Sequence, residues 1–135
     1  MCRPIWQPWR KHLPPPNKEW AEIVRFSRGN AFYHPDIVGY IQELEILCAT
    51  GGGRLPWNQG IEVVAHEIIR ANPRRNMREF WMDCGQLIGA SRGRETTLLY
   101  AEWDTSPGVN AVHGHPKWVD ELRGIVEPEL LRGLE

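Results

Sequence analysis

Apolar residues recur along the first half of the chain at spacings typical of amphipathic helices. Between residues 17 and 29, Trp20, Ile23 and Val24 fall three or four positions apart, and Asn17 is a suitable N-cap. Between residues 35 and 50, one apolar stripe contains Ile37, Tyr40, Ile41, Leu44, Leu47 and Cys48. Glycine lies at or just after the end of each segment, as it commonly does in helices. The pattern predicts helices over residues 17–29 and 35–50.

Two segments in the second half of the chain show similar spacing. Residues 58–71 have an apolar set made of Ile61, Val64, Ala65, Ile68 and Ile69, and residues 74–90 have one made of Met77, Phe80, Trp81, Cys84, Leu87 and Ile88. Pro73 separates the two segments, because a proline disfavours helical backbone in the residue before it. We therefore expect helices over both segments, and a final helix from Pro116 to Arg123.

The segment from Glu95 to Trp103 fits two structures. Its threonines, leucines and Tyr100 suit a strand by propensity, but their spacing also suits a helix. A helix is favoured because no second segment offers a convincing partner strand. The expected fold is mainly α, a single-domain bundle of about five helices over residues 17–135. A small α+β domain is the alternative if residues 95–103 form a strand, and residues 104–116 are expected to form a long loop.

Residues 1–16 are expected to form an extended N-terminal arm. Proline at positions 4, 8, 14, 15 and 16 disfavours both helix and central strand. Two indoles and two cations decorate the arm, at Trp6, Trp9, Arg10 and Lys11. Because tryptophan is enriched at binding hot spots, we expect these residues to dock on another protein or on an identical subunit.

Composition narrows the class of protein. A chain of 135 residues suits one domain, and its net charge of −1 gives no overall attraction to nucleic acid. Its three cysteines are odd in number and widely spaced, which argues against a disulfide framework. No apolar run approaches the roughly 20 residues that span a bilayer, and the first residues do not resemble a signal peptide. We predict a cytoplasmic protein without membrane contact.

Charge is unevenly distributed, and one basic block is prominent. Between residues 70 and 94 there are six arginines and only two acidic residues. The arginines are Arg70, Arg74, Arg75, Arg78, Arg92 and Arg94. Guanidinium groups form forked contacts with phosphates and carboxylates, so this block is a candidate contact surface for nucleic acid or for an acidic protein. Pairing with the acidic C-terminal block of the same chain, or simple solvation, is the other interpretation.

A metal site is the second candidate for chemistry. His113 and His115 are separated only by Gly114, so both imidazoles could reach one ion if the loop curls. Asp104 could add an oxygen ligand and His66 a further nitrogen, and a metal held there could activate water. The zinc-helix motif that begins at His66 is incomplete, because position 70, where the second histidine belongs, is arginine.

Other catalytic signatures are absent from the sequence. The triple glycine at residues 51–53 lacks the lysine of a phosphate-binding loop, and no serine lies in a nucleophile-elbow motif. The sequence therefore favours a non-catalytic interaction protein without a cofactor, a small subunit or adaptor of a larger protein or nucleoprotein assembly. A metal-dependent hydrolase that uses the His113 and His115 loop is the alternative.

Overall fold

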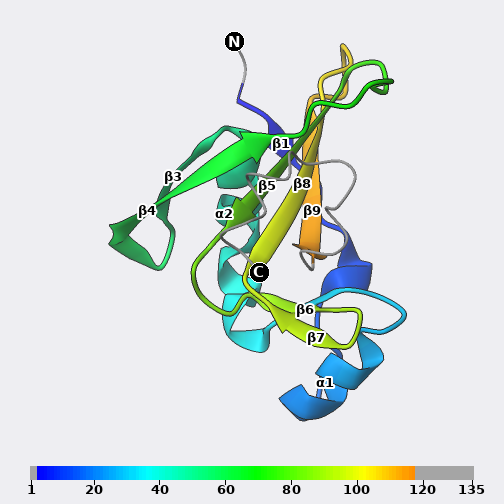
Figure 1. Cartoon of the computed structure of the whole chain (residues 1–135), viewed down its shortest axis with the longest axis vertical. Coiled ribbons are helices and arrows are strands. Elements are labelled where there is room, and N and C mark those ends of the chain that lie inside the picture. The colour runs from blue at the N-terminus through cyan, green and yellow to red at the C-terminus, as the bar shows by residue number, and fades with distance from the viewer. Residues whose placement is uncertain (1–2, 118–135) are drawn as a thin grey trace.

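The computed structural model describes residues 3–117, and these fold mainly into β-strands (Figure 1). The larger sheet has, in spatial order, β1 (Ile5–Trp6), β9 (Ala111–Lys117), β8 (Leu98–Asp104), β5 (Met77–Asp83), β4 (Asn58–Glu67) and β3 (Gly52–Leu55). Neighbouring strands are antiparallel, except that β1 runs parallel to β9. The central trio β5, β8 and β9 is paired over seven residues at each step.

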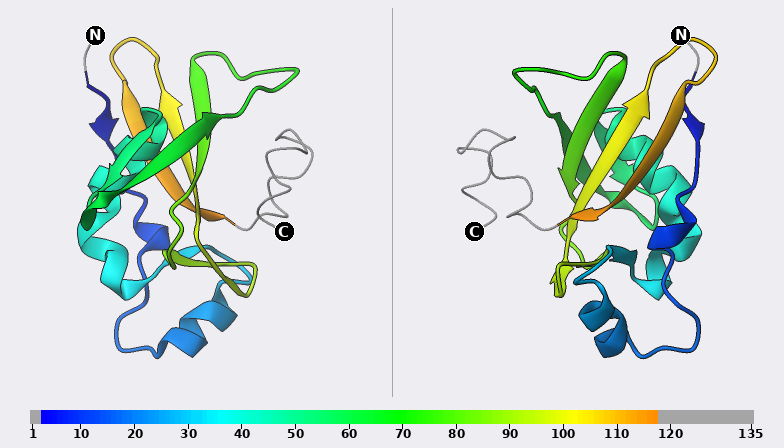
Figure 2. Two further views of the ribbon diagram at one scale, coloured as in Figure 1. Left: turned by 60° about the vertical axis from the view of Figure 1, so that its left-hand side comes forward. Right: turned by 90° about the vertical axis from the view of Figure 1, so that its right-hand side faces the viewer.

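A smaller sheet and four helical segments complete the described fold. The smaller sheet consists of β2 (Phe32–Tyr33), β6 (Gly89–Ser91) and β7 (Arg94–Thr96), in that order. The helical segments are η1 (Arg10–His12), α1 (Trp20–Phe26), η2 (Pro35–Tyr40) and α2 (Ile41–Ala49). Helix α1 contacts the smaller sheet, whereas α2 lies across one face of the larger sheet (Figure 2).

The hydrophobic core lies between α2 and the larger sheet. Leu44 and Cys48 of α2 are completely buried there, together with Met82, Leu99 and Val112 of the sheet. Side chains alternate between the two faces of a strand, so residues next to these in sequence point away from α2. Cys48 and Cys84 are buried free thiols. None of the helices in residues 3–117 is long and apolar enough to cross a membrane.

The face of the larger sheet away from α2, which we term the distal face, carries polar chemistry instead of a second apolar layer. The register aligns Glu79 with Glu102 and Glu102 with His113 across β5, β8 and β9. The next row aligns Trp81, Tyr100 and His115. Residues paired across a sheet present their side chains on the same face, so the fold places two rows of titratable and aromatic groups side by side.

The prediction of a helical bundle is wrong. Helices occur within residues 17–29 and 35–50, but residues 58–71 contain β4, residues 74–90 contain β5 and the start of β6, and residues 95–103 fall in β7 and β8. Strand β5 is buried on both faces, because Phe80 and Met82 face the core while Glu79 and Trp81 are buried on the distal face. Such a strand loses the alternation that would distinguish it from a helix.

Two further expectations concern the chain ends and the loop before them. Residues 104–116 are not one long loop, because Ala111–Lys117 forms β9. Part of the expected N-terminal arm also enters the sheet, since Ile5 and Trp6 pair with Ala111 and Val112. The expected final helix falls almost entirely outside the described residues.

Candidate active site

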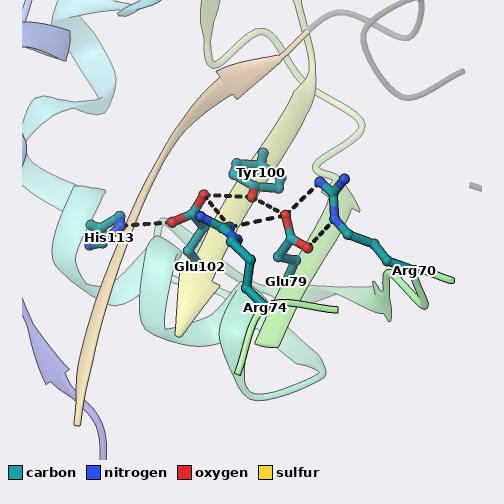
Figure 3. Close-up of polar contacts among 6 residues, drawn as sticks. All are labelled: Arg70, Arg74, Glu79, Tyr100, Glu102 and His113. Carbon is teal, nitrogen blue, oxygen red and sulfur yellow. Dashed lines mark hydrogen bonds and ion pairs between the residues drawn. The ribbon is translucent and has the colours of Figure 1, made fainter. Parts of the chain in front are cut away.

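Three adjacent strands bring Glu79, Glu102 and His113 together on the distal face (Figure 3). The Nε2 atom of His113 lies 3.1 Å from Oε2 of Glu102. Gly114, next to His113, allows β9 to approach β8 closely. A Cβ atom at that position would lie 2.3 Å from the carbonyl oxygen of Tyr100. Close packing of the two strands therefore positions the imidazole against its carboxylate.

The Tyr100 hydroxyl links the two carboxylates. It lies 2.5 Å from Oε1 of Glu79 and 2.7 Å from Oε1 of Glu102. The hydroxyl has one proton to donate, so the two carboxylates share a single donor. The phenol is almost completely buried, at 3% exposure. Glu79, Tyr100, Glu102 and His113 thus form one continuous chain of polar contacts.

Two arginines reach this chain from the connection between β4 and β5. Arg70 forms a forked pair with Glu79, in which Nη2 lies 2.7 Å from Oε1 and Nε contacts Oε2. The Nη2 atom of Arg74 lies 3.1 Å from Oε1 of Glu102 and 3.4 Å from Oε1 of Glu79. The Arg74 side chain is 54% exposed, whereas that of Glu79 is 5% exposed. The guanidinium groups therefore lie between the carboxylates and the surface.

The surroundings keep both carboxylates ionised. Burial alone raises the pKa of Glu102, but hydrogen bonds from His113, Tyr100 and Arg74 outweigh it and lower that pKa to about 2. The pKa of Glu79 is also lowered, because bonds from Arg70 and Tyr100 outweigh the effect of burial. Burial and the two neighbouring carboxylates raise the pKa of Tyr100, so the phenol keeps its proton. The site combines two acceptors, two permanent cations and one neutral donor.

The two nitrogens of His113 have different surroundings. Because Glu102 is a carboxylate, Nε2 donates its proton to Oε2. The Nδ1 atom is buried and has no hydrogen-bond partner within the part of the chain that the structure describes. The Trp9 indole stacks on the imidazole, with ring centroids 3.8 Å apart and planes at 27°. Nδ1 is therefore the nitrogen left to exchange a proton with a bound molecule.

Two more histidines extend the site along β9. The His12 and His115 rings stack with centroids 4.8 Å apart, and each lies within about 6 Å of the Trp9 ring. Burial lowers the pKa of His115 to about 4, with further contributions from His12 and Lys117. Burial also lowers the pKa of His12. Because both pKa values are lowered, these two imidazoles are neutral near pH 7 and add no positive charge to the site.

The six predicted contact arginines do not form one surface. Arg70 and Arg74 belong to the site described above. Arg78 lies on the opposite face of β5, where it forms a forked pair with Glu67 at 2.9 and 3.0 Å. Arg75 is exposed in the connection that carries Arg74, whereas Arg92 and Arg94 belong to the smaller sheet and its turn. Arg78 lies in strand β5 and not in the helix expected over residues 74–90.

The four residues of the metal hypothesis are spread along the distal face. His113 and His115 share that face of β9, but His115 Nδ1 donates to the carbonyl of Pro116 at 2.9 Å. His66 stacks on Trp81, and an Asp104 carboxylate oxygen accepts a backbone hydrogen bond from Ser106. Among residues 3–117 there is no group of three or more histidine, cysteine, aspartate or glutamate side chains that could hold a metal ion.

The predicted partner-binding residues make contacts within the chain. The Trp6 indole N–H donates to Glu45 at 2.8 Å, and Trp9 stacks on His113. Lys11 lies over the Trp9 ring, 5.0 Å from its centroid, and Arg10 is exposed. Binding of a partner by these residues stays a prediction.

Sequence reasoning missed Glu79, Tyr100 and Glu102. The sequence signal for these residues was a period of two, which places side chains on the same face of a strand. Glu79 and Trp81 are two residues apart on β5, as are Tyr100 and Glu102 on β8. A helical interpretation of both segments conceals this period of two. Comparisons of the chain with protein-family models, curated proteins and solved structures found no match. The geometry of the distal face is therefore the basis for a functional proposal.

Proposed function

We propose that the protein cleaves RNA by metal-independent acid–base catalysis at the Glu79, Glu102 and His113 cluster. One observation carries the proposal: two arginines, a buried ionised carboxylate and an imidazole occupy a single connected network on the distal face. Internal cleavage of RNA requires a proton acceptor, a proton donor and cations that stabilise a phosphorane-like transition state. The cluster contains a side chain for each of these three tasks.

Each group has a definite role in the proposed reaction. Glu79 accepts the proton of a ribose 2′-hydroxyl, whose oxygen attacks the adjacent phosphorus. The P–O5′ bond breaks, and His113 in its protonated form gives the Nδ1 proton to the departing 5′-oxygen. The products are a 2′,3′-cyclic phosphate and a free 5′-hydroxyl, so protons and bonds balance. Arg70 and Arg74 bind the phosphate oxygens, which guanidinium groups suit by shape and charge.

Substrate binding also raises the pKa of the proposed base, Glu79. In the free protein, Arg70 and Arg74 hold the pKa of Glu79 low, which makes this carboxylate a weak proton acceptor. A phosphate that takes over these guanidinium contacts removes the main stabilisation of the ionised form. The pKa of Glu79 then rises towards the value that an effective base requires. The arginine–carboxylate pairs therefore form the resting state of the site, and the substrate phosphate replaces the carboxylate as the partner of the arginines.

The proposal is tested by comparing RNA and DNA of the same sequence. DNA lacks the 2′-hydroxyl, so we expect cleavage of RNA only. Glu79→Gln and His113→Gln should each reduce the cleavage rate by about two to four orders of magnitude, the usual loss when an acid or base is removed. Equal cleavage of both polymers, or full activity in both variants, would contradict the proposal.

Self-association is a second candidate function. It is supported by two exposed apolar side chains, Val64 on β4 at 65% and Ile69 just after β4 at 79% exposure. Exposed apolar side chains are candidates for an interaction surface. Light scattering of the full chain tests self-association: a dimer mass that returns to monomer in a Val64→Ser, Ile69→Ser variant supports this role, and a monomer mass in both argues against self-association.

A further inference from the structure

Residues 7–13 run from the edge of the larger sheet onto its distal face, and we term them the strap. The strap follows β1 and contains Trp9 and His12. Trp9 stacks on His113, and His12 stacks on His115. The strap therefore lies against the histidine that the proposed reaction uses as proton donor.

The contact leaves two imidazole nitrogens in an unfavourable position. His113 Nδ1 and His12 Nε2 are buried, and neither has a hydrogen-bond partner among residues 3–117. Buried polar atoms in folded proteins are nearly always hydrogen-bonded, so such atoms call for an explanation. His113 Nδ1 is also the atom that must reach the substrate. The structure is thus a closed state, in which the strap prevents His113 Nδ1 from contacting a substrate.

Hydrogen bonds hold the strap near both of its ends. At its start, β1 pairs with β9 through Ile5 and Trp6, and the Gln7 N–H donates to the carbonyl of Val112 at 2.8 Å. The Trp6 N–H donates to Oε1 of the buried Glu45 at 2.8 Å, directly before the strap begins. Further along, His12 Nδ1 donates to the carbonyl of Ala31 at 2.7 Å, and the Asn30 side-chain amide donates to the carbonyl of Lys11 at 2.5 Å. The Trp6–Glu45 bond therefore acts at the base of the strap, apart from the Trp9–His113 contact.

Space is available for the strap to move. A pocket of about 330 Å³ lies between the strap and the helical segments η2 and α2. Its lining includes Trp9, Arg10 and Leu13 from the strap, and Val38, Ile41 and Glu45 from the helical side. A segment packed on one side against a pocket can shift with less loss of contact than one packed on both sides.

We propose that the strap is an autoinhibitory lid that covers His113 and moves aside to admit the substrate. Its role in regulating cleavage rests on the proposed function, but its movement does not. Opening separates Trp9 from His113 and exposes Nδ1. The Trp6–Glu45 hydrogen bond holds the strap closed from a point outside the site. Weakening that bond should therefore uncover His113 without altering any group that touches the substrate.

Diethyl pyrocarbonate measures this opening without reference to catalysis. An unprotonated imidazole nitrogen attacks its carbonyl carbon, and the leaving ethyl carbonate becomes ethanol and carbon dioxide. Peptide mass spectrometry of the full-length protein gives the modification rate of His113, with His66 on β4 as an internal reference. Trp6→Phe keeps an aromatic ring but removes the N–H donor. Trp57→Phe is the matched control, since it removes an N–H that donates to Gln86 at 2.7 Å.

We expect Trp6→Phe to raise the modification rate of His113 about three- to tenfold relative to His66, the range given by loss of one ordinary hydrogen bond. Trp57→Phe should leave the ratio unchanged. An unchanged ratio in Trp6→Phe, or an equal rise in both variants, overturns the proposal that the strap is a lid. If the ratio rises as expected while the wild-type protein fails to cleave RNA, the strap is a lid but the proposed function is wrong.

Discussion

The Nε2 atom of His113 lies 3.1 Å from Oε2 of Glu102, and this contact determines which imidazole nitrogen remains for chemistry. A carboxylate can only accept, so it fixes the proton on Nε2 and leaves Nδ1 as the exchanging atom. Glu102 is therefore a positioning residue that acts through His113.

Replacing Glu102 with glutamine tests this role. The Glu102→Gln variant replaces an obligate acceptor with an amide that can also donate, so the proton of His113 is no longer fixed on Nε2. We expect the rate at pH 7 to fall about tenfold, in line with the loss of one charge-assisted hydrogen bond. The measurements are kcat on RNA and the tautomer of His113, determined by 15N NMR of the imidazole. A tautomer and a kcat that both match the wild-type protein would contradict the assignment.

Arginine replacements separate the site from the rest of the basic block. Arg74→Gln removes a guanidinium that bridges Glu79 and Glu102, whereas Arg78→Gln removes one that pairs with Glu67 on the opposite face. Both variants change the net charge equally. We expect kcat/KM for RNA to fall about a hundredfold or more in Arg74→Gln and less than threefold in Arg78→Gln. Similar losses in the two variants would indicate a general charge effect.

The Tyr100 hydroxyl should contribute to stability, because it is the donor that the Glu79 and Glu102 carboxylates share. Tyr100→Phe leaves their oxygens with one partner fewer. We expect the free energy of unfolding to fall by about 1–2 kcal/mol in urea titrations at pH 7. Tyr40→Phe is the matched control, since Tyr40 is 37% exposed, and its unfolding free energy should stay within about 0.5 kcal/mol of the wild-type value.

Glu45 should make stability depend on pH near neutrality. Burial outweighs hydrogen bonds from Tyr33, Trp6 and the Gly114 backbone and raises its pKa from 4.5 to about 7. A folded-state pKa above the unfolded value favours the protonated form. The stabilisation is complete below pH 4.5 and is lost as pH rises through 7, a change of roughly 3 kcal/mol.

Glu45→Gln cannot titrate, so it isolates this effect from the opposing contribution of His115. The wild-type unfolding free energy, relative to that of the variant, should fall as pH rises from 4.5 to 7. Paired urea titrations at several pH values within this window give the difference directly. A difference that stays constant across the window would mean that the pKa of Glu45 is not raised.

The sequence allowed the helical parts near residues 20–26 and 41–49 to be predicted, because each has a one-sided apolar stripe with glycine at or just after its end. It did not allow the sheet to be predicted. Ile61, Val63 and Ala65 contact the core with a period of two, but Val64, Ile68 and Ile69 are also apolar and add a helical spacing. Strand pairing is a long-range property, so a short segment with both spacings cannot decide between them.

The candidate site could be predicted only in part. His113, Arg70 and Arg74 were selected from sequence as chemistry-bearing residues, and the structure brings these three into one network. Their carboxylate partners were not selected. Glu79 and Glu102 look like ordinary solvated charges in a helix, and only strand register shows that they face His113. The proposed catalytic residues could therefore be identified only from the strand pairing of the larger sheet.

The most direct test of the proposed chemistry is the identity of the ends formed when the protein acts on RNA in excess EDTA. Nucleophilic attack by the 2′-hydroxyl predicts 2′,3′-cyclic phosphate and 5′-hydroxyl ends, detected by mass spectrometry of a defined oligonucleotide and lost in His113→Gln. Intact RNA in EDTA, or fragments that carry 5′-phosphate ends, would contradict the account.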